Sequence, residues 1–278
     1  MKRASMLLTF LLVAVSHLVV RADVTITMTN SVDGPMAGLI GAAGSTTLRV
    51  QGLKARHDIE VMGRTMATVI DVAARETFLL DQTAKTVRRI PLAASGQPDP
   101  AIAGGLNVQM PKMDVVLERT GRTQQVAGQE CVEFHTVMTM DMSQAGGALA
   151  IPDAREAMKD MRMVMQGSTW VSTSSAEASE YIKFQQGAKA AGIVPPTTLL
   201  AGGNAPDPVA AEGLPCLSEI EISYEGTGPM VEMLKKMGAM KVTGRLTGIS
   251  LAPIDSEVFV VPAGYTEATL QDPLIPRR

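Results

Sequence analysis

The chain has 278 residues, a formal net charge of −3 and 19% charged side chains. A mildly acidic protein offers no basic surface to phosphate backbones, and an aromatic share of 3% leaves few platforms for base stacking. We therefore expect no nucleic acid partner. The hydrophobic share of 46% is sufficient for a large core, in which 19 Met stand against five Phe.

The first 22 residues have the pattern of a secretory signal peptide. Lys2 and Arg3 give a positive start, residues 6–15 are apolar, and small residues precede a cleavage point after Ala22. Cleavage removes three basic residues and no acidic one, so the net charge changes from −3 to −6. We expect a mature chain that begins at Asp23 and is periplasmic or secreted.

The chain has two cysteines, Cys131 and Cys216, and their pairing depends on the compartment of the protein. Oxidising compartments let disulfides form and persist, so an exported chain with two cysteines favours one disulfide between them. Two buried free thiols are the alternative, because cysteine is among the most often buried residue types.

Strands are predicted along most of the chain. The first series has short breaks typical of hairpins, which force an antiparallel meander. Its members are residues 24–29, 46–50, 54–61, 65–71, 77–81 and 85–90. Later strands are predicted at residues 113–120, 131–142, 161–173, 217–224, 240–251 and 258–261.

Helices are predicted in three places. Ser174 and Glu177 form a capping box for a helix that Gly192 ends, Pro229–Met237 is followed by Gly238, and residues 153–160 form a short helical piece. A large antiparallel sheet with two or three helices on one face is α+β, and it must curl into an incomplete barrel around those helices. We expect one such domain over residues 23–269 and a flexible tail at 270–278.

Methionine recurs at strand and helix spacing. Two trios alternate along successive predicted strands, so each lines one face of its strand. They are Met138, Met140 and Met142, and Met161, Met163 and Met165. In the predicted helix from Pro229, four apolar residues are spaced so that they lie on one face: Met230, Met233, Leu234 and Met237.

Three interpretations of these methionines stay open. They are ordinary core, or they line an adaptable apolar cavity, since unbranched thioethers repack around varied apolar ligands. The third is a Cu(I) site, because thioethers select that soft ion. His135 and Cys131 stand at odd positions of their strand and the methionines at even ones, so these ligand types face opposite sides.

Catalytic motifs are not found in the sequence. No nucleophile elbow, zinc-protease motif or phosphate loop occurs, and the carboxylates around residues 130–160 are interpreted as surface charges. His57 is predicted to be solvated or hydrogen-bonded, since no second metal ligand stands at a suitable spacing. We expect no enzyme activity, no metal and no cofactor.

Several short motifs resemble an uncharacterised bacterial exported family near the LolA and LppX type of periplasmic lipoprotein carriers. They are Gly52-Leu-Lys-Ala-Arg56-His-Asp58, Ile70-Asp71, Leu80-Asp-Gln-Thr-Ala-Lys85, Ala127-Gly-Gln-Glu-Cys131-Val-Glu-Phe134 and Val258-Phe-Val-Val-Pro262-Ala-Gly-Tyr265. Together they span nearly the whole mature chain.

The resemblance implies a half-barrel wrapped around helices, with an apolar cavity that holds acyl chains in the carriers. The expected function is therefore non-catalytic binding of a lipid, a lipoprotein acyl chain or another apolar ligand, with the ten residues of the methionine trios and the helix lining the cavity. The alternatives are a periplasmic Cu(I)-binding protein and an envelope interaction module whose core is packed.

Overall fold

A computed structural model describes residues 23–35, 37, 44–61, 63–91, 113–142, 158, 160–193, 209 and 212–268. The predicted signal peptide, the flexible tail and nearly all of the predicted helical piece at residues 153–160 lie outside this part. Twelve strands form one sheet. They are β1 (Asp23–Asp33), β2 (Gly44–Gln51), β3 (Lys54–Val61), β4 (Arg64–Asp71), β5 (Glu76–Asp81), β6 (Thr86–Pro91), β7 (Met113–Val126), β8 (Gln129–Asp141), β9 (Arg162–Ser172), β10 (Leu214–Glu225), β11 (Met240–Ser250) and β12 (Thr266–Glu267).

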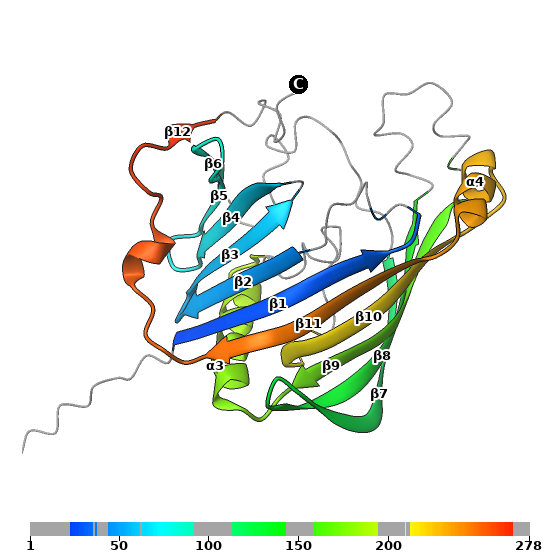
Figure 1. The fold of residues 1–278 in the computed structure, drawn as a ribbon, viewed down its shortest axis with the longest axis horizontal. Coiled ribbons are helices and arrows are strands. Elements are labelled where there is room, and N and C mark those ends of the chain that lie inside the picture. The colour runs from blue at the N-terminus through cyan, green and yellow to red at the C-terminus, as the bar shows by residue number, and fades with distance from the viewer. Residues whose placement is uncertain are drawn as a thin grey trace, which may run out of the picture.

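The helices in the described part are α3 (Ala176–Ala190), α4 (Pro229–Met237) and the 3-10 helix η3 (Ser256–Phe259). Figure 1 shows the curled sheet with α3 on one face and α4 at one end. The predicted α+β architecture, a large curled sheet with few helices, is confirmed. The described strands do not close into a barrel, because β12 and β7 stand at opposite ends of the strand order.

The sheet consists of two meanders and one joining strand. Its order is β12-β6-β5-β4-β3-β2-β1-β11-β10-β9-β8-β7, so β1–β6 and β7–β10 each pair with their neighbours in sequence. β11 lies between β1 and β10 and pairs antiparallel with both. The last strand, β12, runs parallel to β6, so the sheet is mixed and the prediction of a purely antiparallel sheet needs this correction.

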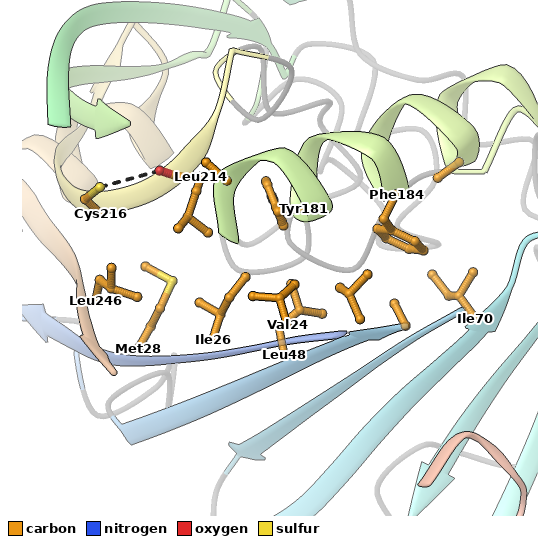
Figure 2. Packing of buried hydrophobic residues seen from close by; sticks show 14 of the residues in the cluster. Val24, Ile26, Met28, Leu48, Ile70, Tyr181, Phe184, Leu214, Cys216 and Leu246 are labelled. Carbon is orange, nitrogen blue, oxygen red and sulfur yellow. Dashed lines mark hydrogen bonds between the residues drawn. The ribbon is translucent and has the colours of Figure 1, made fainter. Parts of the chain in front are cut away.

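Helix α3 packs on the inner face of the sheet. Tyr181 and Phe184 are fully buried against Val24, Ile26 and residues of neighbouring strands. Figure 2 shows these side chains pointing toward one another across the gap between helix and strands. The cluster also includes Ile70 of β4 and Leu214 of β10, so the sheet curls around α3 from both sides.

The ends of α3 differ slightly from the prediction. Ser175, one residue after the predicted capping serine, accepts a hydrogen bond from the backbone N–H of Ala178 at 3.0 Å. Gly192 has φ of 72° and lets the N–H of Ile193 reach the carbonyl of Ala188 at 2.8 Å. Gly192 therefore ends the helix as predicted, because glycine adopts this left-handed conformation without a Cβ clash.

The predicted disulfide between Cys131 and Cys216 is present. The Cα atoms are 6.6 Å apart and the residues are 85 positions apart in sequence. Cys216 stands at a bulge of β10, where the register with β9 shifts between Pro215 and Leu217. The bond links β8 to β10, the two strands on either side of β9.

The C-terminal segment, residues 251–268, crosses the outer face of the first meander and is called the C-terminal strap below (Figure 1). The N–H of Ile254 donates to Asp23 Oδ2 at 2.6 Å, and its carbonyl accepts from Gln51 Nε2 at 2.9 Å. Farther along, Arg56 Nη1 donates to the carbonyl of Val258 at 3.0 Å. The strap then ends as β12 on the edge strand β6.

A second, smaller core lies under the strap. Phe259 is 6% exposed and packs against Ala67, Val69 and Leu80 on the outer face of β4 and β5. The sheet is therefore covered on both faces over its first meander, by α3 inside and by the strap outside.

The strand predicted at residues 258–261 is wrong. η3 occupies Ser256–Phe259 instead, because the side chain of Asp255 accepts the N–H of Glu257 at 3.0 Å and starts a tight turn. Apolar alternation in a short run does not distinguish a strand from a turn that presses one side chain into a core.

Candidate functional site

The inner face that carries α3 continues across the second meander. Across β1, β11, β10, β9 and β8, five residues are paired directly, each with the next, and form a row: Val32, Val242, Ile220, Gly167 and Thr136. Val32 shares its side of β1 with Ile26, which packs near α3. Every second residue of β8–β11 therefore faces the same side as α3.

These inner-facing residues, called the inner strip, are almost free of charge. They are Val115, Leu117 and Arg119 of β7, Phe134, Thr136, Met138 and Met140 of β8, Met163, Met165, Gly167 and Thr169 of β9, Ser218, Ile220, Ile222 and Tyr224 of β10, and Met240, Val242 and Gly244 of β11. Among them, only Arg119 at the rim carries a charge at neutral pH. The strip is thus an apolar surface with a few hydroxyl groups.

Four of the predicted methionines meet in the middle of the strip. Met138 stands directly opposite Met165, and Met140 opposite Met163. Ile220 and Ile222 of β10 complete this methionine cluster. Among the residues that the structure describes, the cluster contains strand residues alone and none from α3 or α4. Its side chains are therefore not locked by packing against a described helix.

Helix α4 closes one end of the strip. Val231 and Leu234 are buried against Met161, and Met142 and Tyr224 pack at the margin. The N–H of Met142 donates to the carbonyl of Met161 at 2.9 Å, which holds the ends of the two methionine trios together. Met237 of α4 also packs against this group. Met142, Met161, Leu234 and Met237 thus form a separate cluster from the other four methionines.

The helix face predicted to line the cavity is rotated in the structure. Met230 is 37% exposed and Met233 is 51% exposed, so neither is on the buried side of α4. Val231 takes the buried position instead. The apolar face of α4 includes Val231 and Leu234 as well as Met230 and Met233, and contact with Tyr224 and Met161 decides which part of that face is buried.

Thr136 stands next to the methionine cluster and has an unusual environment. Its side chain is 6% exposed, and its hydroxyl group has no hydrogen-bond partner in the described part of the chain. Its neighbours in the row are Leu117 on β7 and Gly167 on β9, neither of which has a polar side chain. A buried hydroxyl without a partner lowers stability by about 1–3 kcal/mol, so threonine is an unfavourable residue here if the region is only a packed apolar core.

The other face of the same strands is polar. Glu133 is 1% exposed and accepts hydrogen bonds from Thr120 Oγ1 at 2.6 Å and from Arg122. Burial raises the pKa of Glu133, but hydrogen bonds from Thr120, Ser168 and Arg122 outweigh burial and hold the pKa below its usual value. The Arg122 guanidinium also lies 5.7 Å from the ring centre of Trp170. This network fixes the irregular part of β7 between Arg119 and Thr123.

A small cavity lies under α3. It is lined by Ile26, Met28, Thr46, Leu48, His57, Tyr181, Leu214 and Pro215. Its volume of about 10 Å³ is close to what a single buried water needs, so it does not hold an acyl chain as it stands. Tyr181 is held here by a hydrogen bond from Gln185 Nε2 at 2.6 Å.

His57 is buried in this cavity wall at 2% exposure, so of the two predicted alternatives, solvated or hydrogen-bonded, the solvated one is wrong. Burial lowers its pKa to about 4, although the nearby Asp58 carboxylate acts in the opposite direction. His57 is therefore neutral at neutral pH, and the surface beneath α3 is uncharged there.

Metal binding by ionisable side chains finds no support in the described residues, where no three His, Cys, Asp or Glu side chains gather. Cys131 is bonded to Cys216, and the exposed His135 shares the face of Glu133 rather than that of the methionines. The available soft ligands are the thioethers of the methionine cluster.

Sequence reasoning missed three residues of this site. Ile220 and Ile222 alternate with glutamates in β10, which is the signal of a strand with one apolar face. Thr136 stands at an even position of β8 between Phe134 and Met138, so its inward direction follows from the same alternation. The lack of a partner for its hydroxyl is visible only in three dimensions.

Comparisons with family models and with curated proteins found no match for the chain. Neither helix in the described part of the chain has the length and apolar character of a membrane span.

Proposed function

We propose that this protein is an exported, non-catalytic binding protein for a lipid, a lipoprotein acyl chain or another apolar ligand, and that its single domain over residues 23–269 is a LolA-like half-barrel. The observation that carries the proposal is the uncharged inner strip with a cluster of four methionines, flanked by α3 and capped by α4. Thioether side chains rearrange at low cost, so they can admit an apolar chain of variable shape.

Export to the periplasm or beyond is supported by the disulfide, since such bonds persist in oxidising compartments. The signal pattern of residues 1–22 agrees with this location. An envelope protein that delivers or receives the ligand is the partner that this function requires, whereas nucleic acid has no place in it.

The experiment measures transfer of pyrene-labelled phosphatidylcholine from vesicles to the purified mature protein. In the variant Met163→Asp, a carboxylate enters the methionine cluster at a half-buried position that tolerates it better than the buried Met165. Uptake should fall about tenfold or more, because an unpaired charge is costly on an apolar surface. Circular dichroism and the intact disulfide report that the variant has folded.

The matched control is Met233→Asp, which places the same charge on the exposed side of α4 and should leave uptake unchanged. Equal uptake by the wild type and a folded Met163→Asp variant would contradict the proposal. If the wild type itself takes up no lipid, the envelope interaction module with a packed core becomes the better interpretation.

A Cu(I)-binding protein is the second candidate, favoured by the direct pairing of Met138 with Met165 and of Met140 with Met163. Replacing all four by Leu keeps the surface apolar and removes the soft ligand atoms. Under the lipid proposal the fourfold variant still takes up labelled lipid, and the wild type does not compete with bicinchoninate for Cu(I). Cu(I) capture that the Leu variant loses would favour the second candidate.

A further inference from the structure

The hydroxyl group of Thr136 is the one polar feature of the methionine cluster's surroundings that the fold leaves unexplained. It is buried, it faces the same side as Met138, and it has no hydrogen-bond partner among the residues that the structure describes. By contrast, the hydroxyl of Tyr181 under α3 accepts a hydrogen bond from Gln185. A buried polar group without a partner needs an explanation, and a ligand that supplies the missing hydrogen bond is one.

The surroundings of Thr136 limit the kind of ligand. Gly167, directly opposite on β9, contributes no side chain, and Ile220 beyond it is apolar. Among the inner-facing residues that the structure describes, the one cationic group is the guanidinium of Arg119, which stands opposite Phe134 on the edge strand β7 and is exposed. An anionic head group would find no buried counter-charge beside this hydroxyl and would lose its hydration.

We propose that Thr136 donates a hydrogen bond to the ester carbonyl of a glycerol-linked acyl chain whose hydrocarbon part lies over the methionine cluster. A carbonyl is uncharged and accepts one or two hydrogen bonds, which matches a single hydroxyl on an apolar surface. The inference rests on the proposed function and specifies its ligand class: acyl esters are preferred over free fatty acids and over ether lipids of the same length.

The test uses two probes that differ in the group next to the chain, 1,2-dioctanoylglycerol and its diether counterpart 1,2-dioctylglycerol, and a third, octanoate, which has one chain and a carboxylate. Isothermal titration calorimetry with the wild type should give a Kd for the diester about 3- to 10-fold below that for the diether, as expected for one net hydrogen bond. Octanoate should bind more weakly than the diester.

The variant Thr136→Val keeps the shape of the side chain and removes the hydroxyl. It should bind both diglycerides with nearly equal Kd, because the diester loses about 3- to 10-fold in affinity and the diether loses nothing. The urea midpoint of the free variant should be unchanged or higher, since no hydrogen bond is lost on removal of an unpaired hydroxyl. The control is Thr139→Val, on the other face of the same strand, which should keep the preference of the wild type.

The outcomes separate this inference from the proposed function. If the wild type binds neither diglyceride, the proposed function fails and the inference with it. If the wild type binds both with equal Kd, or if Thr136→Val retains the preference for the diester, the inference alone is wrong and the apolar site remains.

Discussion

His57 shows how one residue couples the packing under α3 to pH. Its imidazole is enclosed by the sheet and α3, with Leu48 and Thr68 opposite it on the neighbouring strands. Burial lowers the pKa of His57 to about 4, whereas an unfolded chain has a histidine pKa near 6.5. Between these two pKa values, His57 is therefore mostly neutral in the folded state and mostly protonated in the unfolded state.

This difference predicts a loss of stability in mildly acidic solution. Above pH 6.5 His57 is neutral in both states and has no effect. As the pH falls from about 6.5 toward 4, only the unfolded state binds the proton, so the free energy of unfolding should decrease by about 2–3 kcal/mol by pH 4.5. Urea unfolding measures this effect. Between pH 7 and pH 4.5, the free energy of unfolding of His57→Gln should decrease by about 2–3 kcal/mol less than that of the wild type.

The control is His135→Gln, an exposed histidine that should keep the pH dependence of the wild type. Glu133 acts at lower pH. Its depressed pKa adds stability above its unfolded value of about 4.3, and that stability is lost as the pH falls through the lower folded pKa. A wild-type stability that stays constant from pH 7 to pH 4.5 would show that the His57 site opens to water.

At the scale of elements, α4 is a short helix whose attachment depends on two side chains. Leu234 and Val231 are its buried residues, while Met233 next to Leu234 is half exposed. Leu234→Ala should lower the free energy of unfolding by about 2 kcal/mol, the low end for a buried Leu, because the site lies at the margin of the molecule. Met233→Ala should change it by less than about 0.5 kcal/mol.

Chemical denaturation of the two variants measures both effects. If Met233→Ala were the more damaging change, the contact face of α4 would be the one that periodicity predicted from Met230, Met233 and Met237, and the packing through Val231 would be wrong.

The elements also show what the sequence predicts well. The methionine alternation in residues 138–142 and 161–165 placed both trios on one face, because the period of two in a strand comes from the pleat itself. The packed side of α4 and the position of the strap depended on partners far away in the chain, Met161 for the helix and Arg56 for the strap. Local patterns carry no information about such contacts.

At the scale of the molecule, the C-terminal strap holds the outer face of the first meander. Phe259 is its buried anchor, and Val260 beside it is 58% exposed. Phe259→Ala should lower the free energy of unfolding by about 3 kcal/mol, and Val260→Ala should change it by less than about 0.5 kcal/mol. Equal unfolding curves for the two variants would mean that the strap contributes little to stability.

The pairing of strands that are distant in sequence could not be predicted. Short turns predicted the first meander, whose strands follow one another closely in sequence, whereas long connections separate β8, β9 and β10 in the second. The position of β11 between β1 and β10 brings together Thr25 and Ser250, and no turn or period encodes that pairing. The isoleucines of β10 became neighbours of the methionines through the pairing of β10 with β9, across a long connection that no turn encodes either.

The place of β11 also has a kinetic meaning. Both meanders are complete by residue 225, yet no described strand other than β11 joins them, and β11 begins only at Met240. A chain still being synthesised therefore carries two half-sheets with open edges at β1 and β10, and the pairing that unites them spans most of the sequence. Contacts of such long range form slowly, so the two half-sheets stay separate until β11 arrives.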